Sequence, residues 1–209
     1  MGYRTISESI EISFIEKKSE FIAKLTPVST NDEAIACIDN VRREHRKARH
    51  VVYAYILRDN NITRYSDDGE PQGTAGMPVL DVLQKNNLTD ICCTVTRYFG
   101  GILLGGGGLV RAYSHSTALA VNSAHIMQME YCRPVTLNMD YSMYGKVQYH
   151  LPNYATLQTG SDFGNNVTLS LLIQEEQTEK FKKDMIELSN GKIKIQIGNL
   201  QYADFSEKL

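Results

Sequence analysis

The first part of the chain alternates hydrophobic and polar residues, a pattern that is typical of half-buried β-strands. The alternation runs through 6–14 and resumes in 21–28 after a polar turn, so these two segments predict a hairpin. The segment 31–46 instead repeats its apolar residues at helical spacing. Thr30 and Glu33 stand at its start with the spacing of a capping box, which predicts that a helix begins there.

The region up to residue 124 continues with short strands and helices. Segments rich in valine, isoleucine and tyrosine at 50–57 and 62–65 flank a polar turn and predict a second hairpin. A short apolar helix is expected through 79–83, followed by a buried strand over the β-branched run 91–98. A second long helix is expected over 109–124, where small side chains would allow close packing.

The composition of the sequence changes after Tyr131, where the glycine-dense loops end. The remaining residues predict elements in the order strand, helix, strand, strand, helix, strand, which is the order of a ferredoxin-like βαββαβ fold. The strands are expected at 135–141, 155–161, 167–173 and 192–203, and the helices at 144–151 and 175–189. We therefore predict an α+β protein with two domains, 1–131 and 132–209.

The composition is that of a folded protein outside membranes. Hydrophobic residues make up 42% of the chain and charged residues 22%, close to the averages for globular proteins. Apolar runs are far shorter than the roughly 20 residues that cross a bilayer. The start of the chain, with Glu8 and Glu11, does not fit a secretory signal, so we expect a cytoplasmic protein without membrane contact.

Four cysteines occur without a Cys-x-x-Cys pair, so we expect neither a zinc site nor a disulfide framework. Buried thiols usually serve as small apolar side chains. Cys92 and Cys93 are adjacent on a predicted strand and should therefore point to opposite faces of a sheet.

One strong cluster of charge stands out against a net charge of -2. It consists of five cations with a single carboxylate, Glu44, among them: Arg42, Arg43, Arg46, Lys47 and Arg49. At the end of a helix these cations offset the helix dipole, and they would also suit RNA phosphates or an acidic protein surface. Because the molecule as a whole is not basic, binding to nucleic acid would have to be local, and no DNA specificity is expected.

Nine of the 15 glycines lie between Gly69 and Gly108, on two loops. Glycine allows the backbone to approach a ligand closely, so the loop 100–108 could present its amides to an anion at the start of the following helix, with Arg97 and Arg111 beside it. Alternatively, the glycines only let a buried strand turn tightly against a helix. The run matches neither a P-loop nor a dinucleotide fingerprint, so no nucleotide cofactor is expected.

The other loop carries three carboxylates, Asp67, Asp68 and Glu70. They could hold Mg²⁺ or Ca²⁺, although their spacing is not that of an EF-hand. The alternative is that they cap turns and pair with Arg97 or Arg111. No nucleophile elbow is present, and His115 is expected on a helix surface, so we assign no catalytic residue and no metal ligand.

The segment 64–76, containing Ser-Asp-Asp-Gly-Glu-Pro-Gln-Gly-Thr-Ala-Gly, closely resembles the YigZ/IMPACT family, as do 96–101 and 105–113. The segments 17–23 and 48–50 add to the resemblance. It implies a first domain like the second domain of a ribosomal protein and a second domain like a late domain of elongation factor G. It also links the chain to eukaryotic relatives that control translation initiation.

The chain departs from the family pattern at a few positions. Gln72 stands where a serine is expected, Gly106 where an alanine is expected, and Val51 and Val52 where relatives often carry a polar residue and a cysteine. The glycine loops remain intact, but a fixed catalytic set around His50 is not supported.

These observations predict a translation-associated binding protein without a cofactor, which contacts RNA, the ribosome or a translation-linked protein. The expected surface is a recess for a negatively charged group, formed where the two glycine-dense loops meet. Its residues are Arg49, His50, Asp67, Asp68, Glu70, Arg97, Gly100, Gly101, Gly107, Gly108 and Arg111. The alternative is a metal-dependent hydrolase or phosphoryl-handling enzyme that uses the acidic loop and the glycine amides.

Overall fold

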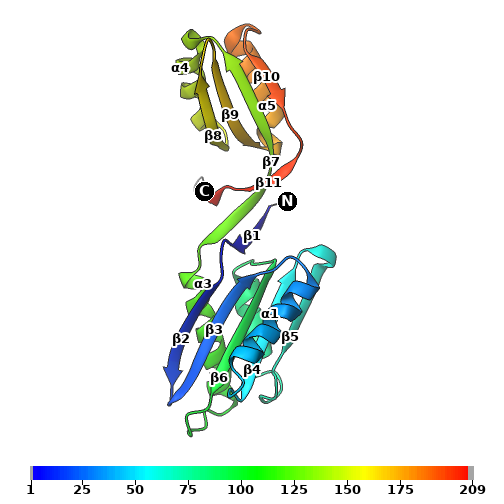
Figure 1. Ribbon diagram of the computed structural model, residues 1–209, viewed down its shortest axis with the longest axis vertical. Coiled ribbons are helices and arrows are strands. Elements are labelled where there is room, and N and C mark those ends of the chain that lie inside the picture. Colours follow the sequence, from blue (N-terminus) through cyan, green and yellow to red (C-terminus); the bar gives the residue numbers. More distant parts are fainter. Residues whose placement is uncertain (1, 207–209) are drawn as a thin grey trace. The chain divides into compact units, whose positions relative to one another are not determined.

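The computed structural model describes residues 2–206, which form two compact units (Figure 1). Tyr3–Met127 make up the N-terminal unit, and the described residues from Gln128 onward, together with Gly2, make up the C-terminal unit. Strand β7 runs through the division at residue 127, and also through the domain boundary predicted after residue 131, so that assignment remains a proposal. No helix within 2–206 is long and apolar enough to span a membrane.

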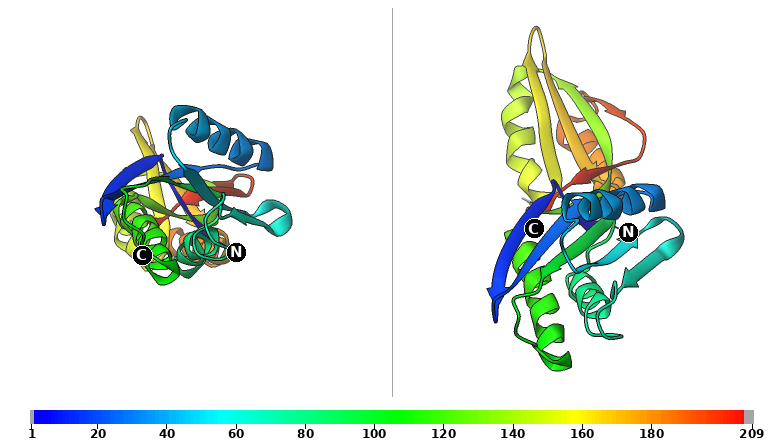
Figure 2. Two further views of the ribbon diagram at one scale, coloured as in Figure 1. Left: turned by 90° about the horizontal axis from the view of Figure 1, so that it is seen from below. Right: turned by 60° about the horizontal axis from the view of Figure 1, so that its bottom comes forward.

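The N-terminal unit contains a five-stranded antiparallel sheet in the order β2-β3-β6-β4-β5. Its elements are β1 (Tyr3–Ile6), β2 (Ile10–Glu16), β3 (Ser19–Pro27), α1 (Asn31–Glu44), β4 (His50–Leu57), a 3-10 turn (Asp59–Asn61), β5 (Ile62–Ser66), α2 (Gly76–Lys85), β6 (Ile91–Tyr98) and α3 (Gly106–Ser123). Helix α1 lies on one face of this sheet, and α2 and α3 lie on the other (Figures 1 and 2).

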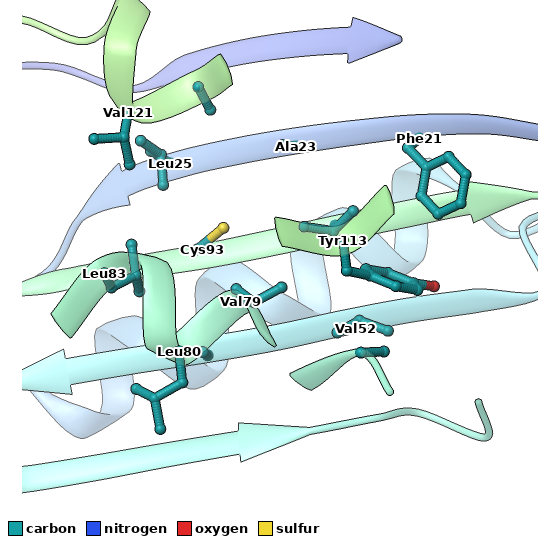
Figure 3. Close-up of a cluster of buried hydrophobic side chains, with 14 of the residues drawn as sticks. Phe21, Ala23, Leu25, Val52, Val79, Leu80, Leu83, Cys93, Tyr113 and Val121 are labelled. Carbon is teal, nitrogen blue, oxygen red and sulfur yellow. The ribbon is translucent and has the colours of Figure 1, made fainter. Parts of the chain in front are cut away.

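Central strand β6 is buried on both faces, which explains its continuous apolar and β-branched sequence. Cys92 packs with Val28 and Ile38 on the α1 side, whereas Cys93 packs with Val79 and other residues on the α2 and α3 side (Figure 3). The prediction that the two adjacent thiols point to opposite faces is therefore confirmed. All four cysteines are free, and Cys37 alone among them is half-buried.

The capping box predicted at the start of α1 is present in a modified form. The Thr30 hydroxyl accepts a hydrogen bond from the Glu33 N–H at 3.2 Å. Glu33 in turn accepts from the N–H of Ser29 at 2.6 Å, one residue earlier than in the usual box. The helix ends at Glu44, two residues before the predicted end, so Arg46 and Lys47 follow it rather than belonging to it.

Helix α3 begins at Gly106, three residues earlier than predicted. The glycines at 106–108, which the sequence suggested were part of a loop, are its first turn. Gly105 precedes them with φ of +71°, a backbone conformation that glycine adopts without strain. The prediction was wrong here because glycine is a poor helix former, while the positive φ before the helix sets its start.

The C-terminal unit is a ferredoxin-like domain. Its elements are β7 (Ile126–Met139), α4 (Tyr141–His150), a 3-10 turn (Leu151–Asn153), β8 (Thr156–Phe163), β9 (Val167–Gln174), α5 (Glu175–Ser189), β10 (Lys194–Ile197) and β11 (Gln201–Asp204). The order β10-β7-β9-β8, antiparallel throughout, and the crossings by α4 and α5 confirm the predicted βαββαβ arrangement. The single strand predicted over 192–203 was wrong, because it is divided into β10 and β11, which pair with successive parts of β7.

Both helices of this unit pack on one face of the sheet. Val147 of α4 and Phe181 and Met185 of α5 are buried with the inward residues of β7 and β9. This core is distinct from the two that flank the N-terminal sheet. The overall class is therefore α+β with two domains, as predicted.

Candidate functional site

The acidic loop between β5 and α2 is held by its own first carboxylate. Asp67 accepts hydrogen bonds from the backbone N–H groups of Gly73, Ala75 and Gly76, at 2.9, 3.0 and 2.9 Å. Gly76 approaches the preceding strand so closely that a Cβ there would lie 2.8 Å from the backbone of Ser66. Asp67 thus folds the loop through both of its carboxylate oxygens.

Asp68 connects the loop with the basic end of α1. One of its carboxylate oxygens accepts from the Arg42 guanidinium at 2.8 Å, and the other accepts from the N–H of Val51 at 2.7 Å. Its carbonyl accepts from Nδ1 of His50 at 2.8 Å. Because a carbonyl can only accept, this contact places a proton on Nδ1 and leaves Nε2 of His50 facing Glu70 at 3.9 Å.

Glu70 is buried at the centre of the site. Its Oε1 accepts from Arg97 Nη1 at 2.6 Å and from the Tyr113 hydroxyl at 2.9 Å. The side chains of Glu70 and Arg97 are only 4% and 7% exposed, so their charges compensate one another in a poorly solvated place. Burial raises the pKa of Tyr113, and the neighbouring Glu70 carboxylate raises it further, so the hydroxyl stays protonated as the donor.

Arg97 reaches the site from β6, where its cross-strand partners are His50 on β4 and Phe21 on β3. Its guanidinium lies 5.5 Å from the centre of the Phe21 ring and 5.6 Å from that of Phe99. Its buried Nε has no hydrogen-bond partner among the described residues. Packing between two rings and one carboxylate therefore fixes Arg97 while leaving a buried donor unsatisfied.

A hollow with a volume of about 320 Å³ opens in front of these groups, hereafter the recess. Its walls come from the end of β6, the acidic loop and the start of α3: Arg49, His50, Gly69, Glu70, Pro71, Arg97, Phe99, Leu103, Leu104, Gly105, Gly106 and Leu109. A Cβ on Gly106 would lie 3.8 Å from the Thr74 methyl group, so the two glycine-dense segments meet here. The first turn of α3 contains no acidic residue and no side-chain cap, and its start at Gly105 and Gly106 lines the recess. The first N–H groups of a helix have no partner within the helix, so a helix start is a suitable place for an anion.

Arg49 supplies the exposed positive charge at the recess. Its guanidinium lies 6.0 Å from the centre of the Phe99 ring, and no carboxylate within residues 2–206 pairs with it. By contrast, Arg42 is paired with Asp68, and Arg97 with Glu70. The structure thus joins Arg49, His50, Glu70 and Arg97 at one place.

Several other residues expected at the site lie elsewhere. Arg111 and Gly108 line a separate hollow of about 220 Å³, together with Phe14, Lys17 and His115. Gly100, Gly101 and Gly107 are absent from the walls of the recess. Gly100 instead packs on the β2–β3 turn, where a Cβ would lie 2.0 Å from the backbone of Lys18.

Sequence reasoning missed the apolar rim of the recess and the role of Tyr113. Leu103 is 82% exposed and Phe99 is 41% exposed, beside the glycines that open α3. Large apolar residues within a glycine-rich loop were a readable signal of a binding surface. Tyr113 packs in the core beneath α3, and its hydroxyl also donates a hydrogen bond to Glu70.

The three carboxylates considered as metal ligands are all engaged by donors of the protein itself. In the part of the chain that the structure describes, no three His, Cys, Asp or Glu side chains lie close enough to hold a metal ion. Asp67, Asp68 and Glu70 instead take the roles of turn capping and ion pairing, which was the alternative from the sequence.

Comparison with known proteins places the recess within a recognised domain. Residues 17–121 match the Impact N-terminal domain, and residues 137–192 match a domain of unknown function, DUF1949. The chain is 39% identical over 204 residues to the IMPACT family member YvyE of Bacillus subtilis, a match that covers 97% of this chain and 94% of that protein. The chain belongs to the IMPACT family. Every residue that lines the recess lies inside the matched Impact N-terminal domain.

Other IMPACT family relatives match the chain over different lengths. The family member YigZ of Escherichia coli is 32% identical over 182 residues, with 86% of this chain and 89% of that protein covered. The Protein IMPACT homolog of Dictyostelium discoideum is 39% identical over 108 residues, which are 49% of this chain and 30% of that protein. A crystal structure described as that of a hypothetical protein is 29% identical, with a TM-score of 0.60 and coverage of 93% of this chain and 96% of the other.

Proposed function

We propose that this IMPACT family chain is a translation-associated binding protein whose N-terminal unit binds RNA, free or within the ribosome. The recess carries the proposal, because it combines an unpaired arginine with the amide-rich start of a helix. The family resemblance supports the link to translation, since it implies a relationship to regulators of translation initiation.

Phosphate is the chemical group that the recess suits best. Gly105 and Gly106, at the start of α3, line the recess, so the positive end of the helix dipole and the first backbone N–H groups of α3 lie beside it. Arg49 adds a guanidinium at the rim, where it can contact phosphate oxygens through two hydrogen bonds. A phosphate in the recess would also compensate the charge that this surface leaves unpaired.

The surroundings of the recess favour a nucleic acid chain over a single small anion. Arg43, Arg46 and Lys47 are exposed near the end of α1, which Asp68 joins to the acidic loop. The half-exposed ring of Phe99 beside Arg49 provides a flat face on which an unstacked base can lie. We therefore expect a single-stranded segment, with a phosphate in the recess and a base on Phe99.

The test is a titration of the full chain, freed of nucleic acid, with a fluorescently labelled single-stranded RNA at several salt concentrations. We expect affinity to fall as salt rises, because bound cations release counterions from the RNA. The variant Arg49→Gln should weaken binding about threefold to tenfold and reduce the slope of log Kd against log salt by about 1.

Lys146→Gln is the matched control, since Lys146 is exposed on α4 of the C-terminal unit and the substitution removes the same charge. It should leave affinity and slope unchanged. Equal loss in both variants would show that only net charge matters and would remove the recess from the proposal. Salt-independent association with a protein that survives nuclease treatment would replace RNA with a protein partner.

A further inference from the structure

A third hollow in the N-terminal unit, of about 370 Å³, opens between α1 and β3. Lys24 and Thr26 contribute to it from β3, and Cys37 and Glu44 from α1. Cys37 is half-buried and lines this hollow, so a small reagent can approach its sulfur from solvent. None of these residues belongs to the recess.

Cys37 has a second thiol beside it. Cys92 lies on β6, is fully buried, and belongs to the apolar cluster between α1 and the sheet against which Cys37 packs. Its cross-strand partner on β3 is Thr26, whose buried hydroxyl has no hydrogen-bond partner among the described residues. Two thiols and one hydroxyl without a hydrogen-bond partner therefore lie together beside the hollow, at a position that apolar side chains usually fill.

The surroundings of Cys37 favour its thiolate form. The neighbouring Cys92 thiol and the positive Lys24 lower the pKa of Cys37, which is about 6 despite the opposing effect of burial. Lys24 lies 3.5 Å from both Glu11 and Glu44, so its charge is partly compensated, and Glu44 acts in the opposite direction on Cys37. The same contact raises the pKa of Cys92, which keeps its proton. A thiolate that reagents can reach is the form that reacts with peroxides.

We propose that Cys37 and Cys92 form a peroxide-sensitive thiol pair, in which Cys37 reacts first and Cys92 then closes a disulfide between α1 and β6. The Cys37 thiolate attacks one oxygen of hydrogen peroxide, the O–O bond breaks, and sulfenic acid and hydroxide form. The Cys92 sulfur then attacks the Cys37 sulfur, and the leaving hydroxyl takes up the Cys92 proton as water. The hydroxide takes up the proton that Cys37 released on ionisation, so in total two thiols are oxidised to one disulfide while one peroxide is reduced to two waters.

Two further cysteines of the same chain serve as internal controls. Cys93 points to the opposite face of the sheet, and burial raises its pKa to about 12. Cys132 lies in the C-terminal unit, where burial also raises its pKa. Neither lines the hollow that gives access to Cys37.

The experiment measures iodoacetamide labelling of each cysteine in the reduced full chain near neutral pH, followed by peptide mapping after treatment with hydrogen peroxide. We expect Cys37 to be labelled at least about tenfold faster than Cys132. Peroxide should yield an intramolecular disulfide that joins the peptides containing Cys37 and Cys92. Cys92→Ser should stop at a sulfenic acid on Cys37 that dimedone traps, whereas Cys132→Ser should still form the disulfide.

Labelling of Cys37 no faster than that of Cys132, or a peroxide-induced disulfide that includes Cys93 or Cys132, would overturn the proposal. Circular dichroism establishes whether Cys92→Ser folds. If it does not, the peptide map of the unsubstituted chain decides alone, since an intramolecular link between the two named cysteines requires no variant.

Discussion

Glu70 determines how much positive charge the recess presents. It binds Arg97 and Tyr113 through one oxygen, so the guanidinium is compensated in the free protein. Glu70 is 27 positions from Arg97 and 43 positions from Tyr113 along the chain. Both contacts therefore depend on how β4, β6 and α3 come together in the fold. The sequence indicated that Glu70 and Arg97 could pair but offered an equal partner in Arg111, which lies in a different hollow. Only the fold decides between them.

Glu70→Gln tests whether Glu70 compensates the charge of Arg97. The amide removes the negative charge and leaves Arg97 buried without an ionic partner, so we expect the free energy of unfolding to fall by about 3–5 kcal/mol. The same loss gives the recess one more uncompensated charge, so RNA affinity per folded molecule should rise. Urea denaturation and the RNA titration measure the two effects.

Tyr113→Phe is the control for this substitution, since it removes one hydrogen bond to Glu70 and leaves every charge in place. It should cost about 0.5–1.5 kcal/mol and leave RNA affinity unchanged. If Glu70→Gln weakens RNA binding in a protein that remains folded, the prediction is wrong. The pairing of Arg97 with Glu70 then does not limit the affinity of the recess for anions.

At the scale of the elements, the glycines have two separate uses. Those at 105 and 106 line the recess, whereas Gly100 allows the end of β6 to pass against the β2–β3 turn. The sequence predicted the glycine-dense region and the strands on either side, because periodicity and turn composition are local signals. It could not separate glycines needed for packing from those facing a ligand, since this difference depends on which backbone lies opposite.

Gly100→Ala should therefore reduce stability without any direct contact with the recess. The added Cβ would lie 2.0 Å from the Lys18 carbonyl group, and the turn would have to move, at a cost of about 1–3 kcal/mol. Gly145→Ala is the matched control: within α4 its Cβ would meet nothing within 4 Å, so it should stabilise the protein by about 0.5–1 kcal/mol. Thermal unfolding of both variants shows whether stability falls in the first and rises in the second. A neutral Gly100→Ala would contradict the close packing.

For the whole molecule, a change of composition along the sequence predicted two domains. The succession of predicted strands and helices predicted the ferredoxin-like fold of the second domain. The net charge of -2 gave no sign of an anion site, because the recess depends on how a few charges are paired. Arg42 is paired with Asp68 and Arg97 with Glu70, which leaves Arg49 as the available cation at the recess. A count of charges cannot make this distinction.

The two units have separate cores, which predicts that damage to one leaves the binding function of the other intact. Met185 is fully buried in the core between α4, α5 and the ferredoxin-like sheet. Met185→Ala should destabilise that unit by about 2–5 kcal/mol, because it removes buried apolar atoms and leaves a cavity. RNA affinity should stay within about twofold of the original, since the recess belongs to the N-terminal unit, and a larger loss would mean that the C-terminal unit takes part in binding. Denaturation followed by circular dichroism, together with the RNA titration under native conditions, distinguishes these outcomes.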